Sequence, residues 1–586
     1  MGGALLPMKS LLDLFRRRWS WTWSKDHPPA AAQIARDCLL GLAAGLGAVL
    51  FQSLTDRVFN GTFGAYALSG TRVFLIGSFA TIVTASLISG WLIAKVCPEA
   101  AGSGIPQLKT AFWKDFGYVP WRVAATKLVG GVISIGGGVS LGREGPSVQL
   151  GGGLSSGLSG LLGLPKQQRR EACAAGAAAG LAAAFNTPLG AITFVLEEII
   201  GDMNSRVLSG VVLAGIMGAF AVHAFNGPQP AFALTISEDA RWSAYLVAPV
   251  VAALAALVGM AFQLLTLRLR QQCRGWTRVP LWLRPAIGGV GVWVFGVAVW
   301  LWSGRLGVFG LGYQDLSQVL RGNFPWLLAL ALLGAKFFAT VLAYGTGGLG
   351  GIFAPSLFLG AMVGATVSGL AAPWMPITGG DQILLMLVGM CASLGALVRA
   401  PLTSILILFE MTHNFSVVPG LMLATLISQA VARSLAKHNF YEAVLEQDGV
   451  HLENLVPPRD LRRWRQTPVA LVASFRPVAV ETTEPATLRA LLTERPYQCF
   501  PVKRDGRVVG VATRRHLEAA AQSGAPLILS PARWISPKAT VREAEQALLD
   551  SPENFLCLGE AATGELLGVL TLHDLLRGIQ EADEKL

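Results

Sequence analysis

A charged pair, Arg143 and Glu144, lies between glycines and just before Pro146 in the otherwise uncharged stretch LGREGPSVQL. Ionised side chains are costly to bury in apolar surroundings, so such a pair needs a function or a partner. Two more segments have a similar design, because GSGIPQ (102–107) and GIFAP (351–355) also place glycine ahead of proline. Proline suits the first turn of a helix, where its missing N–H is not needed. The three segments are therefore predicted to start helices.

Anion binding is the chemistry that several such helix starts can provide together. The first turn of a helix has free N–H donors and about half a positive charge. Glycine ahead of it lets the backbone turn and expose these amides. Helix starts that converge in an apolar environment would hold an anion without a full positive charge, and would therefore release it readily. A simple kink explains any one segment alone, but the three together favour an anion site.

The elements that carry these segments are predicted to be membrane helices. Of the 586 residues, 52% are hydrophobic and only 14% are charged, whereas soluble domains have about one quarter charged residues. The net charge of +11 comes from basic residues outside the apolar runs, which is typical of cytoplasmic flanks rather than of a nucleic-acid-binding surface. Runs long enough to span a bilayer are predicted at 38–55, 73–96, 206–225, 243–267, 285–303, 326–344, 382–397 and 417–436. Other apolar runs are short or interrupted, so the number of crossings stays open.

The membrane region is also predicted to contain an internal repeat. GREGPSV (142–148) and GIFAPSL (351–357) share the pattern Gly-x-x-x-Pro-Ser, at an offset of 209 residues. GAAAGLAAAFNTPLGAITFVLEE (176–198) matches GMCASLGALVRAPLTSILILFEM (389–411) at an offset of 213, with Gly, Leu, Pro-Leu, Ile and Glu in register. Repeated membrane units with interrupted helices are typical of transporters and channels whose site lies at the repeat interface. An odd number of crossings per repeat would make the two copies inverted, which is our expectation.

In this order and spacing, GSGIP, GREGP and GIFAP resemble the CLC family of chloride channels and chloride/proton exchangers, over roughly residues 30–445. The resemblance implies an all-α polytopic membrane fold of two repeated halves with broken helices. It implies a homodimer with one pathway per subunit. The cell membrane is the expected location, because the sequence shows no targeting signal. Chloride and protons would be the substrates, and no metal, required cofactor or nucleic acid is expected.

The resemblance also assigns chloride-binding roles to individual residues. The Ser103 hydroxyl would coordinate chloride, and backbone amides near Gly145, Ile352 and Phe353 would complete the site. Tyr441, in HNFYEAVLE, would direct its phenol at the same anion. Relatives with proline in place of Ser103 favour nitrate, so serine points to chloride. A helix N-cap remains the alternative for Ser103, and an interfacial aromatic residue is the alternative for Tyr441.

Two glutamates are expected to couple chloride to protons. Glu144 matches the gating glutamate, whose carboxylate occupies an outer anion position when ionised and leaves when protonated or displaced. A low dielectric disfavours the ionised carboxylate and helix-start amides favour it, which would keep the proton exchangeable. Glu198 matches the inner proton-accepting glutamate of exchangers, where channels commonly have valine. Because Met411 lies at the matching place in the second repeat, Glu198 is expected to have a specialised role.

Several alternatives stay open. A gated chloride channel would share the fold, and Glu197 and Glu198 could simply cap a cytoplasmic helix end. A CBS-bearing divalent cation transporter would need acidic residues along its pathway, whereas the motifs offer glycine, serine and amides. Enzyme activity has no support, since there is no Ser/His/Asp set and the seven cysteines stand singly. Gln107, where many members have glutamate, and Lys109 depart from the family pattern. In the family fold both lie near the intracellular entrance. The loss of one carboxylate and the gain of one cation there would favour the approach of anions, and neutral drift is the alternative.

The C-terminal part of the chain is predicted to be a soluble α/β region. Residues 466–523 and 528–586 each fit a β-α-β-β-α unit and resemble the CBS domain pair common on CLC tails, expected in the cytoplasm. The preceding parts would be an N-terminal cytoplasmic or interfacial segment (1–30, with a basic aromatic helix at 8–23), the transmembrane domain (31–445, with repeats at about 31–230 and 240–440) and a linker (446–465).

An adenosine nucleotide is the ligand that a CBS pair suggests. CBS pairs that bind such nucleotides use a Thr/Ser-x-x-Asp turn whose acid grips the ribose. The second copy has this turn at Thr571 and Asp574, whereas the first has Thr513 and then His516 in place of the acid. One intact half-site keeps nucleotide binding open, and a dimerisation or scaffold role is the alternative.

Overall fold

The computed structural model describes residues 30–203, 207–227, 229, 232, 240–322, 324–451, 467–475, 477–524, 526–561 and 563–584. The basic helix expected at 8–23 and most of the linker expected at 446–465 lie outside these residues. The chain divides into two compact units, with the boundary between Leu455 and Val456.

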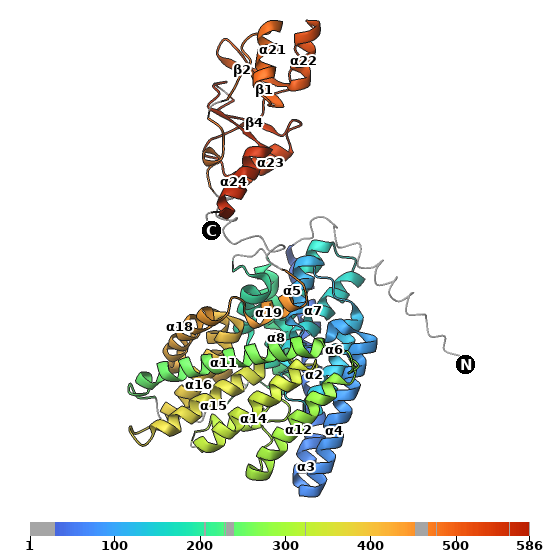
Figure 1. Cartoon of the computed structure of the whole chain (residues 1–586), viewed down its shortest axis with the longest axis vertical. Helices are drawn as coiled ribbons and strands as arrows, with labels where there is room; N and C mark the ends of the chain where they lie inside the picture. Colours follow the sequence, from blue (N-terminus) through green and yellow to red (C-terminus); the bar gives the residue numbers. More distant parts are fainter. Residues whose placement is uncertain are drawn as a thin grey trace, which may run out of the picture. The chain divides into compact units, whose positions relative to one another are not determined.

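The first unit is built from helices (Figure 1). The long helices are α2 (Ala30–Phe59), α4 (Thr71–Trp91), α6 (Trp121–Gly136), α7 (Glu144–Leu161), α8 (Lys166–Phe185), α10 (Leu208–Asn226), α11 (Ala244–Arg274), α12 (Arg284–Ser303), α14 (Trp326–Gly345), α15 (Phe353–Ala371), α16 (Gly379–Val398) and α18 (Val418–Leu435). Shorter helices lie between them: α3 (Ala65–Leu68), α5 (Ile105–Lys114), α9 (Pro188–Phe194), α13 (Tyr313–Val319), α17 (Pro401–Thr412) and α19 (Phe440–Gln447). The π-helical turns η1 (Asn60–Gly64), η2 (Leu92–Val96) and η4 (Val195–Ile200) and the 3-10 turns η3 (Pro98–Ala100) and η5 (Phe415–Val417) complete this unit.

Nine helices in the described part of the chain are long and apolar enough to cross a membrane. The eight predicted apolar runs coincide with eight of them. The ninth is α15, which was not predicted as a span because its apolar run starts inside GIFAP and is interrupted by proline and glycine. In its most apolar window 83% of α15 is buried within the protein, and for α16 the share is 100%. These two helices therefore lie inside the unit, where they face protein rather than lipid.

The short helices α9 and α17 each have a glutamate carboxylate hydrogen-bonded to the backbone of their first turn, and each carboxylate comes from the other half of the chain. Glu410 of α17 accepts hydrogen bonds from the backbone N–H groups of residues 189–190 at the start of α9, at 2.9 and 2.7 Å. Glu197 of η4 accepts from those of residues 402–403 at the start of α17, at 3.2 and 2.9 Å. Each group lies 213 residues from its counterpart. Such exchanged contacts are typical of two copies related by a two-fold axis, and they agree with the predicted repeat.

A second set of matching contacts holds the loops that precede the short helices α5 and α13. The buried Lys127 donates to the carbonyls of Ala100 and Gly102, both at 2.7 Å. The buried Lys336, 209 residues later, donates to the carbonyls of Val308 and Gly310 at 3.3 and 2.7 Å. In both halves a lysine thus holds the loop that precedes a short helix, which again supports the internal repeat.

Removal of one of the reciprocal carboxylates is expected to destabilise the fold. Glu410→Ala would leave two helix-start amides unpaired beside a side chain that is only 8% exposed. Hydrogen bonds to a charged group contribute about 1.5–3 kcal/mol, so the free energy of unfolding should fall by about that amount. Thermal unfolding in detergent measures the effect, and Glu446→Ala, whose side chain is 57% exposed, is the matched control. A melting temperature equal to that of the wild type would contradict this account of the contact.

The second unit is a small α/β region. Its elements are η7 (Val469–Leu471), α21 (Pro485–Glu494), β1 (Cys499–Arg504), β2 (Arg507–Thr513), α22 (Arg514–Ser523), β3 (Trp534–Ile535), α23 (Val541–Leu549), β4 (Phe555–Leu558), β5 (Gly568–Thr571) and α24 (Leu572–Glu584). β1 pairs antiparallel with β2, while β4 pairs parallel with β3 and antiparallel with β5. Burial raises the pKa of the Cys557 thiol to about 12, so this cysteine is a protonated core residue.

The order of these elements agrees with two copies of one unit. The second copy has the whole β-α-β-β-α order, whereas in the first the leading strand is reduced to a bridge between Val480 and Val502. The connecting segments cross between the copies. Ser474 pairs with Val569 of the second copy, and Ser530 pairs with Val511 of the first. The two copies therefore fold as an interlocked pair.

Candidate anion site at the helix starts

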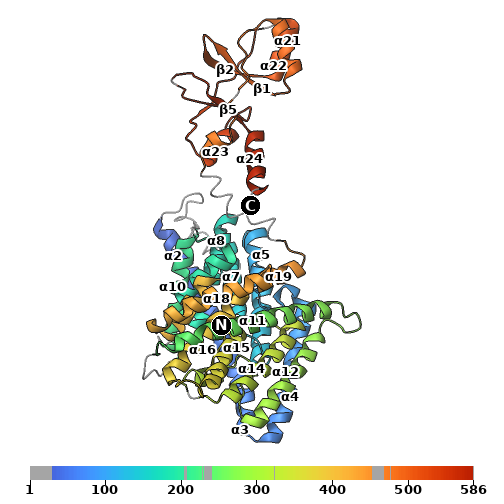
Figure 2. The same ribbon diagram turned by 60° about the vertical axis from the view of Figure 1, so that its left-hand side comes forward.

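The three glycine-rich segments come together in the structure. Gly142 and Gly351 exchange both of their backbone hydrogen bonds, each at 2.7 Å, and the N–H of Gly350 donates to the carbonyl of Gly102 at 3.2 Å. From this junction α5, α7 and α15 begin at Ile105, at Glu144 and at Phe353, as predicted. Helices α5, α7 and α19 lie side by side in both views (Figures 1 and 2), and α5 contacts both of the others. The segments that precede the three helices therefore lie together, as an anion site built from helix starts would require.

Two glycines are required for this close approach. Gly104 has φ of +92°, and a Cβ there would lie 2.4 Å from Oε1 of Gln149. A Cβ on Gly145 would lie 2.2 Å from Oγ of Ser103. Gly145 thus allows the Ser103 hydroxyl to lie against the first turn of α7, where the first amides of the helix have no intrahelical acceptor.

Ser103 and Tyr441 contribute two buried hydroxyl groups to the same place. Both residues are 0% exposed, and neither hydroxyl has a hydrogen-bond partner among the residues that the structure describes. The two hydroxyls approach each other without hydrogen-bond geometry. Tyr441 is carried by α19, which is fixed by a capping box of Asn439 and Glu442. The sequence-predicted pair is therefore brought together, in a fully buried position.

Ile352 and Phe353 lie at the start of α15 with their side chains packed away. Both are buried, and the Phe353 ring contacts those of Phe185 and Phe194, with centroids 5.3 and 6.1 Å apart. As expected from the sequence, the side chains pack and the backbone amides remain as the polar groups. The first N–H groups of a helix have no intrahelical acceptor, so they are available to an anion.

The Glu144 carboxylate lies over the start of α15. One oxygen accepts a hydrogen bond from the Tyr313 hydroxyl, and the other accepts from the backbone N–H of Ala354 at 3.3 Å. Arg143 turns away and contacts both oxygens of Asp56 on α2, at 3.0 Å each. The adjacent charged residues therefore have separate partners. Tyr313 and Asp56 could not be predicted as partners of the motif, because their contacts with it span 169 and 87 residues.

Glu198 is buried in η4 and has two polar partners. Lys109 donates to one carboxylate oxygen at 3.0 Å and Asn439 donates to the other at 2.9 Å. Lys109 also lies 3.6 Å from a carboxylate oxygen of Glu442. Lys109 was noted only as a departure from the family pattern, and its ion pair with Glu198 is a finding of the structure. Glu197, by contrast, faces the start of α17 and forms no part of this cluster.

The Thr571–Asp574 turn of the second unit connects β5 to α24. The Asp574 carboxylate accepts hydrogen bonds from the N–H and the hydroxyl of Thr571, at 2.9 and 2.6 Å, and Thr571 in turn caps the N–H of Asp574 at 3.2 Å. In the first copy, the Thr513 hydroxyl accepts from the N–H of His516 at 3.4 Å. In this structure both turns therefore act as helix caps.

Comparison with known proteins places the chain in a family. A family model described as voltage gated chloride channel matches residues 85–433. The H(+)/Cl(−) exchange transporter ClcA of Salmonella agona is 32% identical over 458 residues, which cover 73% of this chain and 94% of that protein. The ClcA of Klebsiella pneumoniae is 31% identical over 431 residues, covering 72% and 90%. The chain therefore belongs to the voltage-gated chloride channel (CLC) family.

Solved structures share the fold. The crystal structure of a slow cyanobacterial Cl−/H+ antiporter has a TM-score of 0.64 at 24% identity and covers 71% of this chain and 97% of its own. That of a eukaryotic CLC transporter has a TM-score of 0.60 at 18% identity and covers 96% and 98%. The second match therefore extends into the C-terminal unit.

Proposed function

We propose that this protein is a chloride/proton antiporter. The observation that carries the proposal is the pair of buried hydroxyls of Ser103 and Tyr441 beside the converging helix starts, neither with a hydrogen-bond partner among the described residues. A buried hydroxyl without a hydrogen bond is unfavourable by a few kcal/mol, so such groups indicate a ligand. Hydroxyl and amide donors that lie together favour an anion as that ligand. The curated relatives are chloride/proton exchangers, which makes chloride the expected anion. Chloride would be held by these hydroxyls and by amides near Gly145, Ile352 and Phe353.

Glu144 would act as the movable anion of this site. Its carboxylate already contacts the amide of Ala354 at the start of α15, which is the kind of donor that would also hold chloride. The ionised carboxylate and chloride therefore compete for similar donors. Protonation removes the negative charge and weakens the charge-assisted hydrogen bonds. Chloride movement and proton uptake would thus be linked at one side chain.

Glu198 would accept protons on the inner side. It is 3% exposed and shares its carboxylate between Lys109 and Asn439. An ionisable group buried inside a membrane protein marks a functional site by default. Asn439 caps α19 and Tyr441 lies in its first turn, so Glu198 and the proposed chloride site have partners on the same short helix. This arrangement favours exchange over conduction through a channel.

The proposal is tested in vesicles that contain the purified protein. A chloride gradient is imposed with equal pH on the two sides, and the pH of the outer solution is followed. An antiporter moves protons uphill in the direction opposite to chloride, and a protonophore then collapses the signal. If chloride leaves the vesicles without any proton movement, the protein is a gated chloride channel of the same fold.

The assembly and the second unit are part of the same proposal. We expect a homodimer, as the family resemblance implies, located in the cell membrane, with the second unit a CBS pair on the cytoplasmic side. The eukaryotic CLC structure that covers 96% of the chain supports a related fold for this unit. Nucleotide binding stays a prediction. Asp574 is already hydrogen-bonded to Thr571, so a ribose would have to replace these bonds.

A further inference from the structure

We infer that Tyr313 is a latch on Glu144, which favours the ionised, seated carboxylate and so sets the pH at which transport starts. The inference rests on the proposed role of Glu144 as the gate. The Tyr313 hydroxyl donates to Oε1 of Glu144 while the Ala354 amide donates to Oε2. The carboxylate is therefore held from two sides, by the start of α15 and by a side chain from α13. Tyr313 is a positioning residue, because it acts through Glu144.

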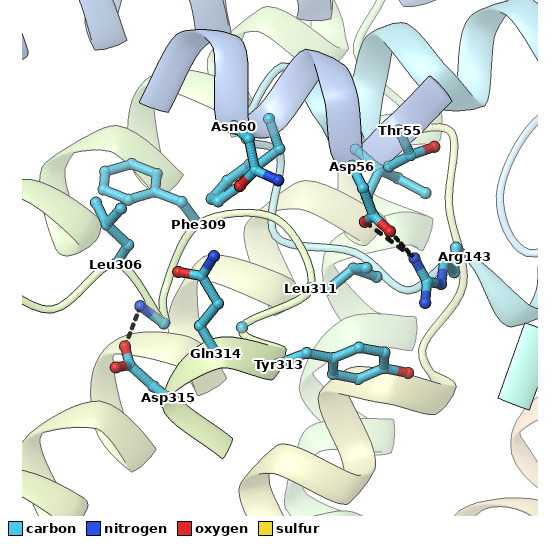
Figure 3. A pocket seen from close by; sticks show the side chains of 14 residues that line it. Thr55, Asp56, Asn60, Arg143, Leu306, Phe309, Leu311, Tyr313, Gln314 and Asp315 are labelled. Atoms are coloured by element: carbon cyan, nitrogen blue, oxygen red, sulfur yellow. Dashed lines mark hydrogen bonds and ion pairs between the residues drawn. The ribbon is translucent and has the colours of Figure 1, made fainter. Parts of the chain in front are cut away.

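The latch lies at the edge of a cavity. The cavity has a volume of about 280 Å³. Its wall includes Asp56 of α2, Asn60 of η1, and Tyr313, Gln314 and Asp315 of α13 (Figure 3). The figure shows the Tyr313 ring beside the Arg143 guanidinium, which is held by Asp56. A cavity of this size, with several polar side chains in its wall, has room for water molecules. The Tyr313 side chain thus stands between this cavity and the buried Glu144.

The position of Tyr313 is fixed by its surroundings. The turn before α13 is closed by Asp315, whose carboxylate accepts from the N–H of Gly307 at 2.6 Å. The next part of that turn is held by Lys336, which donates to the carbonyl of Gly310. The Tyr313 ring is packed edge to face against Phe232, with centroids 5.6 Å apart. A side chain supported in this way presents its hydroxyl in one direction, as a latch requires.

The hydroxyl is selective for one protonation state of Glu144. A hydrogen bond from a neutral donor to an ionised carboxylate is about twice as strong as one to a neutral carboxyl group. Tyr313 therefore favours the charged form and opposes protonation. Three other titratable or charged side chains face the Glu144 carboxyl group: Arg143, Lys336 and Tyr441. Arg143 is paired with Asp56, and Lys336 interacts with Asp315. None of these side chains is removed by a change at Tyr313, so its contribution can be isolated.

Tyr313→Phe tests the latch, because it removes only the hydroxyl. Transport requires protonation of Glu144, and loss of the donor makes protonation easier. The pH of half-maximal chloride transport should therefore move upward by about 1–2 units, which corresponds to a charge-assisted hydrogen bond. Tyr313→Leu, a second deletion of the donor, should shift the profile in the same direction. The measurement is the rate of chloride release from vesicles across a series of pH values that are equal inside and outside.

Two comparisons make the result specific. Tyr66→Phe removes a hydroxyl that lies 3.2 Å from the Thr81 hydroxyl, away from the gate, and should leave the profile unchanged. In a Glu144→Gln background the gate cannot ionise, and Tyr313→Phe should cause no further shift. A Tyr313→Phe profile identical to that of the wild type, with proton coupling intact, would overturn the latch alone. Failure of the wild-type protein to move protons would instead overturn the proposed antiport.

Discussion

Glu144→Gln is expected to abolish proton transport while chloride continues to flow down its gradient. Glutamine has nearly the same shape as glutamate, but it carries no charge and does not take up a proton. It would therefore neither compete with chloride for the donors at the start of α15 nor deliver a proton. The hydrogen bonds now made by Tyr313 and Ala354 would have a neutral acceptor. Proton movement should fall to the level of vesicles without protein, and the chloride rate should lose its dependence on pH.

The control for this variant is Glu410→Gln. Glu410 is also a buried glutamate that accepts two backbone hydrogen bonds, but it lies at the start of α9 and is outside the proposed pathway. It should retain coupled transport. Proton transport at the wild-type rate in Glu144→Gln would show that another group carries the proton.

The second large effect is expected at Glu198. Glu198→Gln keeps an acceptor for Lys109 and Asn439 but removes the exchangeable proton. Proton flux should therefore be lost, while chloride still reaches the site of Ser103 and Tyr441. Simultaneous measurement of chloride and proton flux in the same vesicles separates the two, since a damaged fold would lose both.

A double variant addresses the charge pair. Removal of one partner of a buried ion pair leaves an uncompensated charge, whereas removal of both is better tolerated. Glu198→Val alone would leave Lys109 with only Glu442, at 3.6 Å. Glu198→Val with Lys109→Met should be more stable than Glu198→Val and equally unable to move protons. If the double variant transports protons like the wild type, Glu198 does not have the proposed role.

The parts of the site that could be predicted are those encoded locally. Glycine followed by proline determines where α5, α7 and α15 begin, and hydrophobic runs determine eight of the nine candidate spans in the described part of the chain. The repeat further indicated that Glu197 and Glu410 are equivalent, and the structure shows them in equivalent contacts. The α15 span was not predicted, because a helix buried within protein needs no uninterrupted apolar run.

The contacts that were not predicted join residues far apart in the chain. Lys109 and Glu198 are separated by 89 residues, and Tyr313 and Glu144 by 169. Only the folded structure brings such pairs together, and neither has a spacing that a helix or a strand would explain. The pairing of each connecting segment with the other copy of the C-terminal unit was also not predicted, because only the folded structure shows it.

The most direct test of coupled exchange is chloride accumulation driven by protons. Vesicles that contain the wild-type protein are prepared with equal chloride on both sides and are then given a pH gradient, with valinomycin and equal potassium to hold the membrane potential at zero. An antiporter is predicted to concentrate chloride on the acidic side, against the chloride gradient that develops, and Glu144→Gln is predicted to abolish this accumulation. If chloride stays at equal concentration while the pH gradient persists, chloride and protons are not coupled and the central claim is wrong.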